Sequence, residues 1–200
     1  GDKTAPALTG VLPTGQSNIN ACMSAAPAGP SEAVIAALYT DLCGTVHATK
    51  SGAPTGTNCS WTAAYTYHIT DDCGNAVAND VVITYSGGDQ TAPTITCPSF
   101  SGNNASRNAN TANCTYVASS GEFNASASDN CSTPTLSYSL SGATTGSGSN
   151  LNGVVFNVGV TSVKWTATDA CNHINTCSFT VTVAGNAGSL SIVCPSNVSV

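Results

Sequence analysis

The chain has little charge, few basic residues and no long apolar run. Charged residues make up 7% of its 200 positions, against about 25% in ordinary globular domains. Four basic residues face ten acidic ones, which gives a net charge of −6. Nucleic acids and anionic membranes both attract basic surfaces, so neither is an expected partner. Because no apolar run of about 18 residues occurs, we expect no membrane insertion.

Closely spaced cysteine pairs are missing as well, although the chain has ten cysteines. Structural zinc sites take four ligands, mostly as close pairs of cysteine or histidine. The best candidate, Cys171-x-His173-x-x-x-Cys177, has no second pair, so zinc is not expected. Ten cysteines in a chain of this size instead predict disulfides formed in an oxidising, extracellular compartment. A signal peptide is missing too, so we expect a mature product or an excised fragment.

Signatures of a catalytic site are equally scarce. No nucleophile elbow of the form G-x-S-x-G occurs. The only glutamates, Glu32 and Glu122, have no obvious acidic partner for glycoside cleavage. His68 stands next to Tyr67 in an aromatic segment of strand character, where a histidine usually has a structural role. The sequence therefore predicts a protein that is not an enzyme.

What the chain does contain is an internal repeat of about one domain length. Three short motifs recur at offsets of 87, 88 and 98 residues: 2–6 as 89–93, 40–43 as 128–131, and 70–73 as 168–171. We therefore expect two domains, 1–87 and 88–185. Residues 191–196 repeat 94–99, so 186–200 is expected to be the first strand of a following repeat or a strand donated to another subunit.

Most segments of the chain have the period of two that is typical of β-strands. Residues 61–70, 135–140, 163–168 and 176–183 alternate between two kinds of side chain or are rich in aromatic and β-branched residues. Several short strands in each 90 residues or so predict an all-β protein of tandem β-sandwiches. The exception is 30–38, where good helix formers follow the plausible cap Ser31 and predict one short helix in the first domain.

The internal alignment also predicts disulfides. Cys97 and Cys177 lie near the first and last strands of the second domain, and the first domain lacks both, so we predict that they are partners. The pairings of the other cysteines are assigned from their positions alone: Cys43–Cys73, Cys131–Cys171 and Cys22–Cys59, with Cys114 joined to Cys194 or to nothing.

These motifs resemble those of a known family. Residues 91–98 resemble the beginning of a hyalin-repeat domain, and 158–170 with 177–183 resemble its end, so the resemblance covers about 89–184. The first domain, through 61–75, is similar to divergent repeats in large secreted adhesins of gliding bacteria that are exported by type IX secretion. The resemblance implies immunoglobulin-like sandwiches, a cell-surface location, a role in adhesion or stalk building, and no catalysis. Cys171-Asn172-His173 replaces the small residue and Gly-Asn turn of the family, which implies an extra disulfide there.

The most informative polar residues are aspartates that the repeat duplicates. In a sandwich, the turns that follow these strands and the incoming linker gather at one end, and calcium prefers six to eight oxygen ligands. We therefore predict two candidate calcium sites: Asp89, Asp129 and Asp169 in one, and Asp2, Asp41 and Asp71 in the other. The alternative is that each aspartate only caps its own turn by accepting backbone N–H groups.

Three functions follow from this interpretation. The first is a repeat of a long cell-surface adhesin. The second is a subunit of a self-assembling extracellular filament, in which Ser191–Val200 completes a neighbouring sheet by strand addition. In both, the partners are neighbouring repeats or subunits of the same protein. The third is a carbohydrate-binding accessory module, in which Trp61 and Trp165 stack on surface glycans, although strand aromatics are more often core residues.

Overall fold

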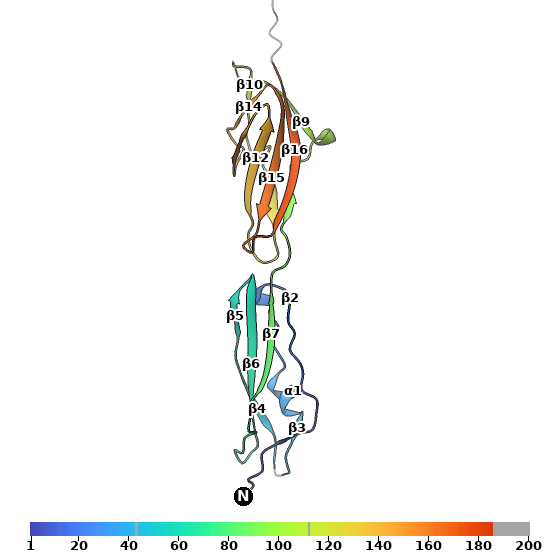
Figure 1. Ribbon diagram of the computed structural model, residues 1–200, viewed down its shortest axis with the longest axis vertical. Coiled ribbons are helices and arrows are strands. Elements are labelled where there is room, and N and C mark those ends of the chain that lie inside the picture. The colour runs from blue at the N-terminus through green and yellow to red at the C-terminus, as the bar shows by residue number, and fades with distance from the viewer. Residues whose placement is uncertain (43, 112, 186–200) are drawn as a thin grey trace, which may run out of the picture. The chain divides into compact units, whose positions relative to one another are not determined.

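The computed structural model describes residues 1–42, 44–111 and 113–185. Their regular secondary structure is almost entirely β, and they form two compact units, each an immunoglobulin-like β-sandwich (Figure 1). Unit 1 contains Gly1–Ala92 and two loop segments, Asp129–Thr133 and Asp169–His173, and unit 2 contains the other segments. The division thus falls after Ala92 rather than after residue 87. The two loops group with unit 1, where each is held by a disulfide.

Unit 1 has one main sheet and one small sheet. The main sheet has the order β2-β7-β6-β4, with β5 pairing along the first part of β6, and the small sheet pairs β1 with β3. The strands are β1 (Ala7–Leu8), β2 (Ile19–Asn20), β3 (Tyr39–Thr40), β4 (His47–Ser51), β5 (Pro54–Thr57), β6 (Ser60–Thr70) and β7 (Val81–Gly88). Alternation along β6 buries Trp61, Tyr65 and Ile69 among other residues of the core.

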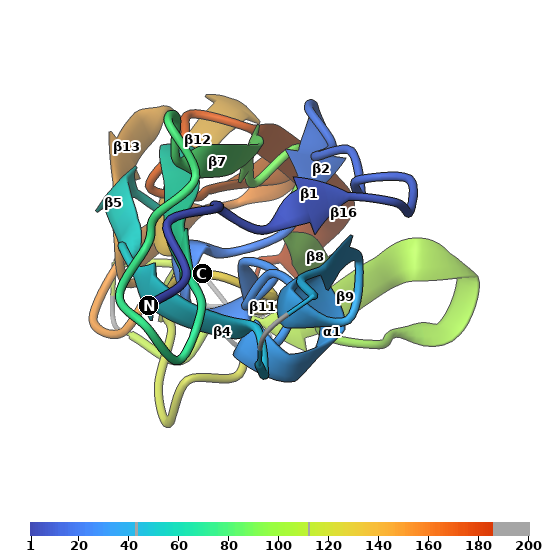
Figure 2. The same ribbon diagram turned by 90° about the horizontal axis from the view of Figure 1, so that it is seen from below.

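One short α-helix, α1 (Glu32–Ala36), follows a 3₁₀ turn (Met23–Ala25) in unit 1, as the sequence predicts. Ser31 caps it, because its hydroxyl accepts the backbone N–H of Val34 at 3.4 Å. Ile35 is fully buried and anchors the helix in the core. The helix lies against β4 (Figure 2). No helix in the described ranges has the length and apolar character needed to span a membrane.

Unit 2 follows the same plan with longer strands. Its main sheet has the order β13-β12-β15-β16-β9, and two small sheets pair β8 with β11 and β10 with β14. The elements are β8 (Thr94–Thr96), a 3₁₀ turn (Ser101–Asn103), β9 (Asn104–Asn108), β10 (Thr115–Val117), β11 (Ser126–Ser128), β12 (Thr135–Gly142), β13 (Gly146–Gly148), β14 (Val155–Asn157), β15 (Gly159–Thr168) and β16 (Ile174–Ala184). The core is aromatic, and Trp165 Nε1 donates to the Phe123 carbonyl at 2.9 Å.

The strand registers of the two units match at the sequence offsets. Leu8 pairs with Tyr39 between β1 and β3, and Ile95 pairs with Ala127 between β8 and β11, at offsets of 87 and 88. The first residue pair of β4 and β6 is His47–Thr70, and Thr135–Thr168 is its counterpart in β12 and β15, at offsets of 88 and 98. In each unit an early strand also runs parallel to the last one, β2 with β7 and β9 with β16. The sequence repeat is therefore a repeat of the fold.

The Cys97–Cys177 bond, predicted from the alignment, is present in unit 2, with Cα atoms 5.9 Å apart. It joins the end of β8 to β16, so the first and last strands are covalently linked. The two cysteines are 80 positions apart in the sequence. A bond that closes a loop of this size constrains the unfolded chain strongly.

The other predicted pairings need correction. Cys131 is joined to Cys22, and Cys171 is joined to Cys59, instead of Cys131 to Cys171 and Cys22 to Cys59. Cα–Cα distances of 5.2 Å at both bonds show that the loops carrying Cys131 and Cys171 lie beside unit 1 residues that have no cysteine counterpart in unit 2. Cys73 and Cys114 are exposed, and neither forms a disulfide among the described residues. The structure therefore gives Cys73 no disulfide partner, contrary to the predicted Cys43–Cys73 bond. Cys43 and Cys194 lie outside the described residues.

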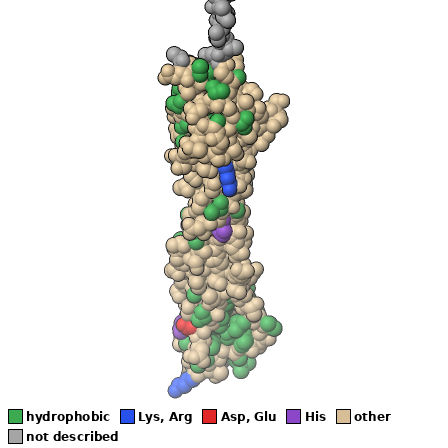
Figure 3. Space-filling view, turned by 45° about the horizontal axis from the view of Figure 1, so that its top comes forward, with side chains coloured by type: hydrophobic (Ala, Val, Ile, Leu, Met, Phe, Trp, Pro, Cys, Tyr) green, Lys and Arg blue, Asp and Glu red, His purple; other side chains and the backbone are tan. Residues whose placement is uncertain are grey.

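The low charge of the chain is visible on its surface. On the face shown in Figure 3, basic and acidic side chains are few and scattered. Some apolar side chains are exposed instead, among them Leu8 at 47% and Leu42 at 97%. Leu8 lies in β1 of the small β1–β3 sheet of unit 1, and Leu42 follows β3.

Candidate metal centres

The duplicated aspartates stand at strand ends in both repeats. Asp2 precedes β1, and its counterpart Asp89 follows the end of β7 and precedes β8. The others follow the ends of β3, β6, β11 and β15: Asp41, Asp71, Asp129 and Asp169. All six belong to unit 1, because the loop segments 129–133 and 169–173 group with it.

The first group, the Asp2 cluster (Asp2, Asp41 and Asp71), contains the three residues expected from the repeat. One carboxylate oxygen of each lies within 4.8 Å of the other two. Asp71 is buried; its Oδ1 accepts two backbone N–H groups and its Oδ2 accepts the Asn75 amide at 2.7 Å. Asp2 Oδ1 accepts the N–H of Thr4 at 3.0 Å, whereas its buried Oδ2 has no hydrogen-bond donor in the structure described.

The second group, the Asp89 cluster, consists of Asp89, Asp169 and His173, whose ligand atoms also lie within 4.8 Å of one another. Asp89 is 4% exposed and Asp169 is 6% exposed. Asp89 Oδ1 accepts the N–H of Thr91 at 3.0 Å and the Asn130 amide at 3.4 Å, but Asp89 Oδ2 has no donor within the described ranges. Asp169 Oδ1 accepts two backbone N–H groups, and its Oδ2 lies 2.8 Å from His173 Nδ1.

Asp129, the third residue expected in this group, stands outside the set of mutually close ligand atoms. Its Oδ2 accepts the backbone N–H groups of Cys131 and Ser132, at 2.9 and 3.1 Å. Its Oδ1 is buried and has no donor among the residues described. The neighbouring Asn130 is the residue that reaches Asp89. Asp129 therefore resembles Asp2 and Asp89 in its unpartnered oxygen, although it is not in the cluster.

His173 is the member of the Asp89 cluster that the sequence argument missed. As a metal ligand, the sequence offers it only in a zinc pattern with Cys171 and Cys177, which are bonded to Cys59 and Cys97. The available signal was its spacing: His173 follows Asp169 by four residues, as Asn75 follows Asp71. Both donate to the carboxylate four positions earlier in the chain.

Hydrogen bonds keep the carboxyl groups of Asp2, Asp71 and Asp169 ionised at neutral pH. The backbone N–H of Thr4 lowers the pKa of Asp2, and the side-chain amide of Asn75 lowers that of Asp71. Burial opposes ionisation of Asp169, but hydrogen bonds from His173 and backbone amides outweigh it, so its pKa is lowered as well. In the Asp2 cluster, the ionised carboxylates of Asp2 and Asp71 therefore lie close together and repel one another. Carboxylate oxygens in this arrangement suit a hard divalent cation.

Turn capping and metal binding, the two alternatives for these aspartates, are compatible, because they would use different oxygens of the same side chain. In Asp2, Asp89 and Asp129, one oxygen caps the turn by accepting a backbone N–H, and the other is buried and unpartnered. Capping alone therefore accounts for half of each carboxylate. The remaining oxygens are the part of the arrangement that points to a ligand.

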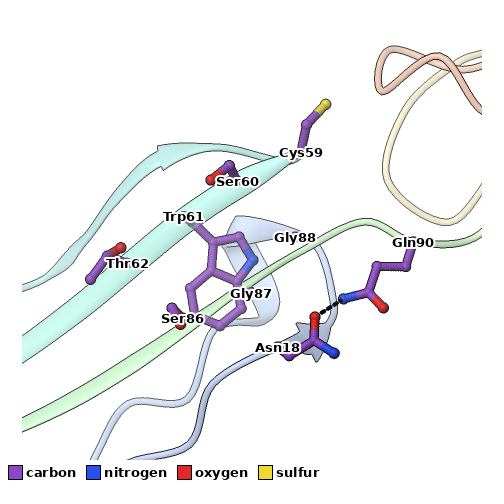
Figure 4. A pocket seen from close by; sticks show the side chains of 9 residues that line it. All are labelled: Asn18, Cys59, Ser60, Trp61, Thr62, Ser86, Gly87, Gly88 and Gln90. Carbon is purple, nitrogen blue, oxygen red and sulfur yellow. Dashed lines mark hydrogen bonds between the residues drawn. The ribbon is translucent and has the colours of Figure 1, made fainter.

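The two tryptophans expected to stack on glycans are core residues. Trp61 is 2% exposed and Trp165 is 1% exposed. Trp61 lies beneath a surface hollow that is lined by residues such as Asn18 and Gln90, whose side chains are hydrogen-bonded at 3.0 Å (Figure 4). Its Nε1 donates to the Ala21 carbonyl at 2.8 Å. Neither indole face is open for stacking, which corrects that part of the glycan-binding hypothesis.

Comparisons with known proteins add little to this picture. No protein-family model matches the chain, and no curated protein matches it. Among solved structures, the chain is similar to the extracellular cadherin domains 3–6 of protocadherin gamma B2, with 15% sequence identity and a TM-score of 0.34 over 73% of this chain. The chain spans 43% of the length of that structure. The resemblance to hyalin repeats and bacterial adhesins stays a prediction.

Proposed function

We propose that the chain is a non-catalytic structural module of an extracellular surface protein, which carries mechanical load between neighbouring repeats or subunits of the same protein. The observation that carries this proposal is the set of three disulfides, Cys22–Cys131, Cys59–Cys171 and Cys97–Cys177. The bonds interleave, because each begins inside the loop that the previous one closes. Disulfides of this kind form and persist outside the reducing cytosol, which supports an extracellular location.

The interleaved bonds shorten the covalent route along the chain. The shortest route from Gly1 to Gly185 passes through Cys22, Cys131, Cys97 and Cys177 and contains about 63 peptide bonds, whereas the backbone alone contains 184. Removing any single disulfide lengthens the shortest route to about 72 peptide bonds at most. The route is therefore redundant, as a load-bearing element requires.

The shortened route limits how far the module can be stretched. A fully extended chain spans at most about 3.5 Å per residue. The oxidised module therefore cannot extend beyond about 220 Å, and the reduced one reaches about 640 Å. A module of this kind yields little length under tension even when its sheets unfold.

Single-molecule force spectroscopy tests this function. The chain is held through handles at residues 1 and 185 and stretched before and after treatment with a reductant. We expect final extensions near the two limits above, and a variant carrying Cys22→Ser with Cys131→Ser should remain close to the oxidised value. An oxidised chain that extends to the length of the reduced one would contradict the proposal. Antibody labelling of intact source cells tests the location, and labelling that requires permeabilisation would contradict it.

Calcium is the cofactor that we propose for this module. The Asp2 and Asp89 clusters supply the oxygen ligands and the negative charge that the ion prefers. A bound ion would hold the loop segments 129–133 and 169–173 more firmly in unit 1, and so add stiffness to a load-bearing structure.

A second candidate function is a filament subunit that exchanges strands. The observation that favours it is the small β1–β3 sheet, where Leu8 of β1 and Leu42, which follows β3, expose their side chains. Exposed apolar side chains at a sheet edge favour addition of a strand from another molecule. Ser191–Val200, the proposed donor, lies outside the described residues. Electron microscopy of the oxidised chain with and without 191–200 tests this candidate, which predicts filaments only for the complete chain.

A further inference from the structure

We propose that the Asp89 cluster is a calcium site in which carboxylate oxygens bind the ion, while His173 orients Asp169 without binding the ion itself. This inference rests on the proposed function, because it specifies how a structural module would hold its cofactor. It goes further in naming the ligand atoms and in assigning His173 a role. It also predicts which metals the site rejects.

The strongest observation is an unpartnered oxygen in a buried side chain. Asp89 is 96% buried, since only 4% of it is exposed, and its Oδ2 has no hydrogen-bond donor in the described part of the chain. A buried carboxylate oxygen without a partner is strongly unfavourable. Asp89 also belongs to a group in which one of its carboxylate oxygens, one of Asp169 and a ring nitrogen of His173 lie within 4.8 Å of one another. A cation bound at this group would give the unpartnered Oδ2 a partner.

The carboxylate of Asp89 is also held in place for this purpose. Its Oδ1 accepts the backbone N–H of Thr91 at 3.0 Å and the side-chain amide of Asn130 at 3.4 Å. These two bonds fix the orientation of the carboxylate and leave Oδ2 as its unpartnered oxygen. Asp2 shows the same division in the first repeat, where Oδ1 accepts the N–H of Thr4 and Oδ2 is buried and unpartnered.

The role of His173 follows from comparison with Asn75, its counterpart in the repeat. Asn75 Nδ2 donates to Asp71 Oδ2 at 2.7 Å, and His173 Nδ1 lies 2.8 Å from Asp169 Oδ2. An amide nitrogen has no lone pair for a metal, so the Asn75 atom that contacts Asp71 can orient the carboxylate but cannot bind an ion. The matching geometry assigns His173 the same role. It is a positioning residue, and the ligand set consists of oxygens.

An all-oxygen set determines which ion is preferred. Zinc is bound mainly by histidine and cysteine, and both cysteines near His173 are committed to disulfides. Magnesium demands near-octahedral geometry and retains several water molecules. Calcium accepts six to eight oxygens in irregular geometry, which permits carboxylates, backbone carbonyls and water to share the ion. The buried Oδ1 of Asp129 is available as a further oxygen if the 129–133 loop adjusts.

The test is calcium titration of the complete oxidised chain after removal of bound metal with a chelator, followed by isothermal titration calorimetry and thermal unfolding. We expect calcium to bind and to raise the melting temperature. Asp89→Asn should remove one binding equivalent. It should also melt higher than the wild type in chelator, because a neutral amide replaces the unpartnered anionic oxygen. The control is Asp80→Asn, an exposed aspartate that pairs with His68 and lies outside both clusters. It should leave calcium binding unchanged.

Two histidine variants separate a positioning residue from a ligand. His173→Asn recreates the Asn75 arrangement and should keep the calcium equivalent, whereas His173→Ala loses the hydrogen bond to Asp169 and should weaken binding. The proposal is overturned if the wild-type chain gives no heat of calcium binding, or if the Asp89→Asn variant binds as many calcium ions as the wild type. It is also overturned if the chain binds zinc more tightly than calcium and the His173→Asn substitution abolishes that zinc binding. Failure here leaves the proposed function intact, because the extension limit set by the disulfides does not depend on an ion.

Discussion

Removing the Cys97–Cys177 bond tests how much of the stability of unit 2 comes from linking its first and last strands. The perturbation is the double variant Cys97→Ala with Cys177→Ala. The two cysteines are 80 positions apart, but the Cys59–Cys171 bond already shortens the covalent route between them to about 44 peptide bonds. In the chain-entropy model, opening a loop of this size destabilises the folded state by about 4 kcal/mol. Domains of this size unfold with a free energy of about 5–15 kcal/mol, so the loss is large.

The assay exploits the two tryptophans, which lie in different units. Trp61 is buried in unit 1 and Trp165 in unit 2, so in a Trp61→Phe background the fluorescence of Trp165 reports on unit 2 alone. Urea unfolding of the double variant in this background should show a large fall in the midpoint. Cys114→Ser, at an exposed cysteine without a disulfide, is the control and should leave the midpoint unchanged. A loss below about 1 kcal/mol would refute the reasoning, because the loop-closure term would then be absent.

Three further predictions concern single residues. Burial opposes ionisation of Glu122, but hydrogen bonds from Tyr116 and Arg107 outweigh it and hold the pKa of Glu122 below its ordinary 4.5. The contribution of ionised Glu122 to stability is complete above pH 4.5 and is lost as the pH falls through the lowered pKa. In the Glu122→Gln variant, the free energy of unfolding of unit 2 should therefore fall less steeply as the pH is lowered below 4.5, as measured by Trp165 fluorescence. Phe123→Ala should destabilise unit 2 by about 3–5 kcal/mol in urea unfolding, because removing the buried ring leaves a cavity in the aromatic core. Ile35→Ala should cost unit 1 about 2–5 kcal/mol by the same measurement, and a value near zero for either would show that the core relaxes around the cavity.

The two-domain β-fold was predictable because short sequence motifs recur in both domains. The offsets of 87, 88 and 98 residues reappear as matching strand registers, since an aspartate at a strand end fixes where pairing stops. The short helix was predictable from its cap and its helix formers. Strand β9 was not, because Asn104–Asn108 is polar and forms a strand only through its parallel pairing with β16.

The disulfides and the candidate site show where an internal alignment fails. Alignment equates positions, so it suggested bonds between cysteines that recur together, such as Cys131 and Cys171. The actual partners, Cys22 and Cys59, have no cysteine counterpart in unit 2, and only the fold brings them close. The Asp2 cluster was predictable because its three aspartates recur in the alignment. The position of His173 beside Asp169 was not, because it depends on loop geometry that sequence spacing alone does not determine.

The interleaving of the disulfides also determines what happens when the backbone is cut. Every peptide bond between Cys22 and Cys177 lies inside at least one disulfide-closed loop. A single proteolytic nick in that stretch therefore yields two fragments that stay covalently joined. Because proteases cut first in exposed loops, most single cleavages would leave the two fragments covalently joined. Only a nick combined with reduction, or a cut near either terminus, would release part of it.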